Sequence, residues 1–199
     1  MKDPQSNTFA GIASILVGVA FVAFVVLALM GPGRLFHGVL AVASLVAFAV
    51  VLGLAATHAD SAPGWTLWGS SLGLFGLALS AIVQTSLLLG VDRQQLRPQI
   101  VLTISTVAAW VLIISLVALA DRDWSAAWSW VGIALSLMWA GLIPAQQFGV
   151  RAAAIGLSAG ATVLASIWFI WAGVLLRRAG GDPRERVDRG AARAMQDRP

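Results

Sequence analysis

The segment PQIVLTISTVAAWVLIISLVALA, which runs from Pro98 to Ala120, carries no charged residue and decides the fold class. An α-helix needs roughly 20 apolar residues to cross about 30 Å of hydrocarbon, so this segment is long enough for one crossing. Five more charge-free segments follow the same pattern: residues 4–33, 35–59, 61–91, 124–150 and 152–176. None shows the alternation of a barrel strand. The sequence therefore predicts an all-α integral membrane protein, a six-transmembrane-helix bundle with short loops in residues 1–176.

The predicted spans are separated by residues that favour turns. Their ranges are about 9–30, 36–57, 66–89, 100–120, 124–143 and 153–176. Gly31-Pro32-Gly33 separates the first two spans, and Pro144 is predicted to end the fifth because proline interrupts helical hydrogen bonding. The short connection Asp121-Arg122-Asp123 predicts a tight antiparallel hairpin between the fourth and fifth spans.

The overall composition agrees with a membrane protein. Hydrophobic residues make up 59% and charged residues 11% of the chain, against about 45–50% and about 25% in soluble domains. The absence of cysteine excludes disulfides, thiolate metal sites and cysteine nucleophiles. His37 and His58 lie near opposite ends of the second span, about 31 Å apart along a helix, so one metal ion cannot bind both. We expect both histidines to be interfacial and solvated, and no cofactor is predicted.

The distribution of basic residues predicts the orientation. Seven arginines lie in the tail, residues 177–199, and six spans place this tail on the same side as Lys2 and Arg122. The other side carries four arginines, Arg34, Arg93, Arg97 and Arg151. The positive-inside rule then places both termini in the cytoplasm, with the protein in the plasma (inner) membrane. The tail also contains acidic residues, and Asp182-Pro183-Arg184-Glu185 predicts a helix start near the lipid surface. The predicted partner is therefore the lipid bilayer and not a nucleic acid.

Small residues at helical spacing predict close helix packing. Helices in lipid associate where small side chains let their backbones approach. The predicted packing residues are Ser14, Gly18, Gly69, Gly73, Gly132, Gly156 and Gly160.

Most of the nine tryptophans fall near predicted span ends. Seven of them predict an interfacial belt on the side of the termini: Trp65, Trp68, Trp124, Trp128, Trp130, Trp168 and Trp171. Trp110 lies near the middle of its span and is predicted to fill the core.

Several polar side chains lie inside the predicted spans and leave two interpretations open. Gln84 is the most polar of them, roughly 9 Å past the middle of its span. One interpretation is hydrogen bonding between helices, and the other is a narrow polar pathway. The residues of the possible pathway are Gln84, Thr103, Thr106, Trp110, Ser158 and Thr162.

The spans lack the charged side chains that active transport or catalysis needs. Ion pumps and proton-coupled carriers use ionisable groups at membrane depth, and general acid–base catalysis needs positioned proton donors and acceptors. The sequence thus predicts no enzyme. It favours a structural or accessory subunit that packs through glycine and serine faces on another membrane protein or a second copy of itself. The alternative is a passive channel or facilitator for a small neutral solute.

In length, number of spans and tryptophan content the chain resembles the small six-span urea and amide channels. It shares no motif with them and has no glutamate or tyrosine within a span, so the resemblance implies no site residues.

Overall fold

The described residues of the computed structural model, 4–30, 33–121 and 124–180, form six α-helices. They are α1 (Pro4–Met30), α2 (Arg34–His58), α3 (Pro63–Leu88), α4 (Arg97–Ala120), α5 (Ala126–Gln147) and α6 (Arg151–Ala179). Each helix is long enough and apolar enough to cross a membrane, which confirms the predicted helices. Gly31, Pro32, the centre of the predicted 121–123 hairpin and the predicted helix start at Asp182 lie outside the described residues.

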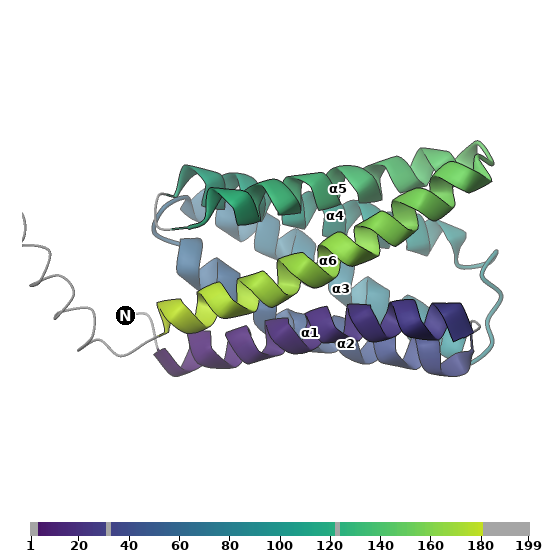
Figure 1. Ribbon diagram of the computed structural model, residues 1–199, viewed down its shortest axis with the longest axis horizontal. Helices are drawn as coiled ribbons and strands as arrows, with labels where there is room; N and C mark the ends of the chain where they lie inside the picture. The colour runs from purple at the N-terminus through teal and green to yellow at the C-terminus, as the bar shows by residue number, and fades with distance from the viewer. Residues whose placement is uncertain (1–3, 31–32, 122–123, 181–199) are drawn as a thin grey trace, which may run out of the picture.

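The six helices form a closed ring in which each helix packs against its neighbours along the chain (Figure 1). α6 returns to α1, and this closing contact is the most extensive in the ring. Because successive helices are antiparallel, the start of α1 and the end of α6 share one end of the ring with the α2–α3 and α4–α5 connections. We call this the termini end. The other three connections lie at the opposite end, which we call the loop end.

Prolines lie near helix ends, but the fifth helix ends later than predicted. α3 begins at Pro63, and Pro98 lies in the first turn of α4, where the missing N–H group has little effect. The prediction that Pro144 ends the fifth helix was wrong, because α5 continues to Gln147. The N–H of Phe148 donates to the carbonyl oxygen of Pro144 at 2.8 Å. The proline thus lies inside the last turn of α5, where it cannot donate the usual hydrogen bond to the carbonyl oxygen of Ala140.

The outer surface of the ring is covered by large apolar side chains. Many of these side chains are more than half exposed, among them Leu16, Val42, Leu52, Phe75, Leu137 and Val163. Apolar exposure on this scale is unusual for a monomer in water and suits contact with hydrocarbon.

Small residues bring α1 and α6 into backbone contact. A Cβ atom on Gly173 would lie 2.5 Å from the carbonyl oxygen of Gly11, and one on Gly18 would lie 2.9 Å from a carbonyl oxygen of α6. Between them, Ser14 is fully buried and its hydroxyl donates to the carbonyl oxygen of Phe169 at 2.6 Å. The structure thus places Ser14 and Gly18 in a helix contact, as the sequence predicts, and adds Gly11 and Gly173 to it.

Glycines also set the spacing around α4. A Cβ atom on Gly73 of α3 would lie 2.8 Å from the indole ring of Trp110, and one on Gly69 would lie 2.9 Å from another α4 side chain. On the other side of α4, a Cβ atom on Gly132 of α5 would overlap the hydroxyl of Ser115. These three predicted packing glycines all face a neighbouring helix.

In the first half of α6, one of the two predicted packing glycines makes no contact with another helix. Gly160 lies against the side chain of Met138, 3.0 Å from the position of its Cβ atom. Gly156 has no atom within 4 Å of that position, so it makes no helix contact within the described chain. Ala152 and Ala159, one turn on either side of Gly156, are exposed as well. This outer face of α6 (Ala152, Gly156 and Ala159) is therefore a strip of small side chains on the surface of the ring.

Candidate functional site

A cavity of about 180 Å³ lies among the helices in the loop-end half of the ring. Residues from all six helices line it. An apolar cavity of roughly 150 Å³ in another protein is large enough to hold benzene, so this one has room for about six to eight non-hydrogen atoms.

Four of the cavity residues on α2, α3 and α4 have polar side chains, and we call them the polar wall: Ser44, Ser80, Gln84 and Thr103. The other lining residues on these helices are apolar: Leu40, Ala43, Ala47, Leu77, Ile104 and Val107. The hydroxyl of Ser44 donates to the carbonyl oxygen of Leu40, and its oxygen lies 2.8 Å from that of Ser80. The side-chain amide of Gln84 is hydrogen-bonded to His37, with 2.8 Å between Oε1 and Nδ1. Since a carbonyl oxygen only accepts, Nδ1 of His37 carries the proton in this contact.

Thr103 completes the polar wall on α4. Its hydroxyl oxygen is buried and has no hydrogen-bond partner among the described residues. Leaving a buried hydroxyl without a partner costs about 1–3 kcal/mol, so an unpaired group of this kind calls for an explanation. A molecule in the cavity with a hydrogen-bonding group would supply the missing partner.

The opposite side of the cavity is an apolar wall, formed by Val17 and Phe21 of α1, Trp139 of α5 and Phe169 of α6. Phe21 and Phe169 stack with their ring centroids 5.7 Å apart. The hydroxyl and amide groups of the lining therefore lie on α2, α3 and α4, whereas α1, α5 and α6 contribute apolar and aromatic side chains only.

A continuous series of aromatic rings fills the termini-end half of the ring. We call it the aromatic ladder: Trp110, Trp168, Trp128, Trp124 and His58. Successive centroids in this order lie 5.7, 4.8, 4.9 and 4.7 Å apart. Trp110 and Trp168 also contact Phe169, which lines the cavity, so the ladder begins next to the cavity on its termini-end side.

The ladder corrects part of the predicted tryptophan belt. Trp128 and Trp168 are fully buried, and the indole N–H of Trp128 donates to the carbonyl oxygen of Trp168 at 3.0 Å. They lie near span ends, as the sequence suggests, but their helix faces point into the ring. Trp65, Trp68 and Trp130 are each at least 60% exposed, as a belt requires. The prediction that Trp110 fills core volume agrees with its complete burial.

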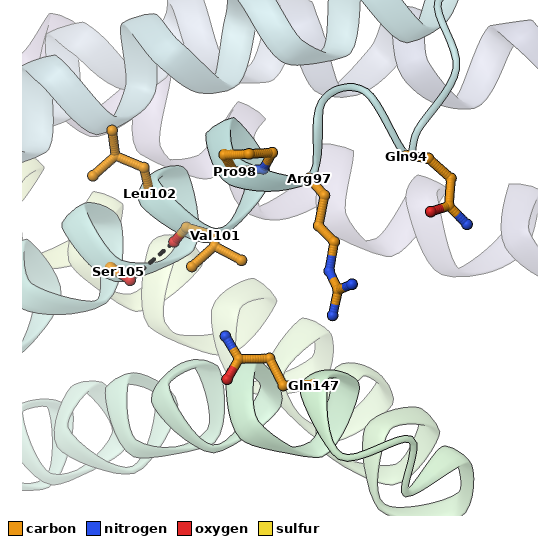
Figure 2. Close-up of a pocket in the computed structure, with 7 residues that line it drawn as sticks. All are labelled: Gln94, Arg97, Pro98, Val101, Leu102, Ser105 and Gln147. Carbon is orange, nitrogen blue, oxygen red and sulfur yellow. Dashed lines mark hydrogen bonds between the residues drawn. The ribbon is translucent and has the colours of Figure 1, made fainter.

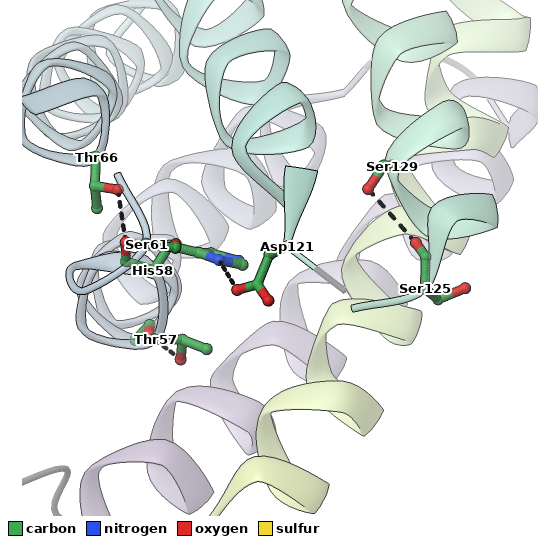
Figure 3. Close-up of polar contacts among 8 residues, drawn as sticks. Thr57, His58, Ser61, Thr66, Asp121, Ser125 and Ser129 are labelled. Carbon is green, nitrogen blue, oxygen red and sulfur yellow. Dashed lines mark hydrogen bonds and ion pairs between the residues drawn. The ribbon is translucent and has the colours of Figure 1, made fainter. Parts of the chain in front are cut away.

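The prediction of a solvated His58 was wrong, because this side chain is fully buried at the termini end (Figure 3). Its Nδ1 atom lies 3.3 Å from a carboxylate oxygen of Asp121, the residue that follows α4. The indole of Trp124 covers the imidazole ring, and Thr66 donates to the His58 carbonyl oxygen at 3.1 Å. The sequence gives no sign of this pairing, because it depends on how the α2 and α4 ends meet.

The structure brings together two of the residues of the possible pathway, Gln84 and Thr103, at the cavity. The others lie elsewhere: Trp110 belongs to the ladder, Thr106 and Thr162 donate to carbonyl groups of their own helices, and Ser158 is exposed on α6. Sequence reasoning missed His37 and Ser44 as partners of this wall. Their spacing of seven residues, two helical turns on one face of α2, is a signal that could have found them.

A second hollow lies on the outside of the bundle, between α4 and α5 at the loop end (Figure 2). It measures about 680 Å³, and Arg97 and Gln147 extend into it from the two helices. It shares no lining residue with the cavity inside the ring. We assign it no function.

Comparisons of the chain with models of known protein families, with curated proteins and with solved structures found no match.

Proposed function

We propose that the protein is an integral membrane protein whose six helices span the plasma (inner) membrane, with both termini in the cytoplasm. The apolar outer surface of the ring supports this location. Arg177 and Arg178 in the last turn of α6 lie at the termini end and support the orientation. In this orientation the cavity lies in the outer half of the membrane.

We further propose that the protein is a passive facilitator for a small neutral solute. The observation that carries this proposal is the polar wall, because four hydrogen-bonding side chains face a cavity inside a ring of apolar helices. Three of them are paired with protein groups, whereas the buried hydroxyl of Thr103 has no partner among the described residues, and an unpaired group is costly to bury unless a bound molecule pairs with it. Conduction would require the ladder to move, since Trp110 and Trp168 fill the ring beneath the cavity.

Filling the cavity is expected to lower solute flux. In Ala43→Leu, the larger side chain would take up space between the two walls, since Ala43 lines the cavity on α2. We expect several-fold slower glycerol entry into liposomes that contain the variant, measured by stopped-flow light scattering. Ala56→Leu is the matched control, because Ala56 is exposed on the same helix. Wild-type flux equal to that of empty liposomes, or equal flux for Ala43→Leu and wild type, would contradict the proposal.

The structural or accessory function is a second candidate, and the outer face of α6 favours it. Ala152, Gly156 and Ala159 form a strip of the kind that lets two membrane helices approach closely, yet none of the six described helices occupies it.

Gly156→Ile is expected to abolish association with a partner subunit if this second candidate is right. An isoleucine there would hold a docked helix away from the α6 backbone, while the ring itself has space for it. Native mass spectrometry of the protein purified gently from its own membrane tests this expectation. A second polypeptide or a second copy, lost in Gly156→Ile, would support the accessory function. A monomer in both samples would rule it out.

A further inference from the structure

We infer that the solute is a small neutral molecule with hydrogen-bonding groups along one edge and C–H groups along the other, of which glycerol and short 1,2-diols are the simplest examples. This inference rests on the proposed function and names the substrate class of the same cavity. It follows from the arrangement of the two walls.

The polar wall sets the hydrogen-bonding edge of the solute. Because the Ser44 hydroxyl donates to Leu40, Ser80 donates to Ser44 and can only accept from a solute, and the oxygen of the Gln84 amide is already engaged by His37. The buried hydroxyl of Thr103 has no partner among the described residues. A solute hydroxyl at this position would donate to or accept from it.

The apolar wall sets the hydrocarbon edge. Phe21, Trp139 and Phe169 offer ring surfaces and no hydrogen-bond acceptor on this side. The indole N–H of Trp139 is a donor only. A solute that is polar on its whole perimeter, such as urea, would leave N–H groups unpaired against these rings. Each unpaired group costs about 1–3 kcal/mol, whereas the C–H edge of a diol loses nothing by the contact.

The lining also excludes ions. The cavity contains no Asp, Glu, Lys or Arg side chain among its lining residues, and a charge without a partner is far more costly to bury than a hydroxyl group. The volume of about 180 Å³ admits glycerol and short diols and restricts larger sugars.

Solute selectivity in liposomes tests the inference. We expect glycerol and 1,2-propanediol to enter faster than urea, after subtraction of the rates for empty liposomes. Thr103→Val removes the hydroxyl with little change of shape and should slow glycerol entry roughly three- to tenfold while leaving urea entry unchanged. Thr85→Val is the control, because Thr85 is exposed on the outside of α3. Urea entry as fast as glycerol entry, or no effect of Thr103→Val, would overturn the inference while leaving the facilitator proposal in place.

A binding measurement separates the two proposals. Trp139 lines the cavity and Trp130 is exposed, so ¹⁹F NMR of protein labelled with 5-fluorotryptophan contains a reporter and an internal control. Variants Trp139→Phe and Trp130→Phe assign the two signals. A saturable shift of the Trp139 signal with 1,2-propanediol, reduced in Thr103→Val and absent with urea, supports the inference even if no flux is found. Equal shifts of both tryptophan signals would overturn it.

Discussion

Gly173→Ile is expected to prevent the ring from closing. The Cβ position of Gly173 lies 2.5 Å from the carbonyl oxygen of Gly11, and this backbone atom cannot move aside as a flexible side chain could. A branched side chain there would push α6 away from α1 and separate the hydroxyl of Ser14 from its carbonyl acceptor on α6. We expect a loss of about 3 kcal/mol or more in the free energy of unfolding.

The measurement is reversible unfolding in detergent micelles, followed by tryptophan fluorescence. Gly156→Ile is the matched control, because it makes the same change on the same helix at a position with no neighbour within 4 Å. We expect the control to unfold with nearly the wild-type free energy. Equal destabilisation by both variants would mean that helix propensity, and not the α1–α6 contact, accounts for the loss.

Trp110→Ala is expected to cause a second large loss of stability. The indole is fully buried, lies against Gly73 and contacts Trp168 at the top of the ladder. Removing a buried aromatic side chain from a packed core typically costs about 3–5 kcal/mol, because the neighbours close the space only in part. Trp130→Ala removes the same side chain from an exposed position and should change the free energy of unfolding far less.

The Trp110 variant also has a functional consequence. Truncation of Trp110 would create space next to Phe169, which lines the cavity. Folded Trp110→Ala protein should therefore admit larger solutes than the wild type. The measurement is the rate of erythritol entry relative to that of glycerol. Trp110→Phe keeps most of the ring and serves where the alanine variant is too unstable to purify. A free energy of unfolding in Trp110→Ala equal to that of the wild type would show that the packing of Trp110 in the ladder does not stabilise the fold.

The helices of this protein were predictable because charges are excluded from hydrocarbon. Segments such as 98–120 are marked at both ends by charged residues, and their length alone indicates one crossing each. Helix ends were less predictable. Pro144 illustrates this, since α5 continues past it to Gln147 although proline disfavours an interior helical position.

The site was predictable only in part, because residue type does not reveal which way a helix faces. Gln84 and Thr103 were identified as polar residues within spans, and both line the cavity. Ser158 has the same character, yet it lies on the outer surface, because the contacts of α6 with α1 and α5 fix the rotation of the helix. The burial of His58 was likewise not predictable from the sequence, because Asp121 lies next to it only when the ends of α2 and α4 come together in the fold.

The α1–α6 contact bears on how the protein is made. Of the six helices, α1 is synthesised first and α6 last, so the most extensive helix contact in the ring joins the first of them to the last. Until α6 enters the bilayer, the hydroxyl of Ser14 and the bare backbone at Gly11 and Gly18 face lipid or a chaperone instead of their final neighbour. Closure of the ring therefore cannot precede the synthesis of α6.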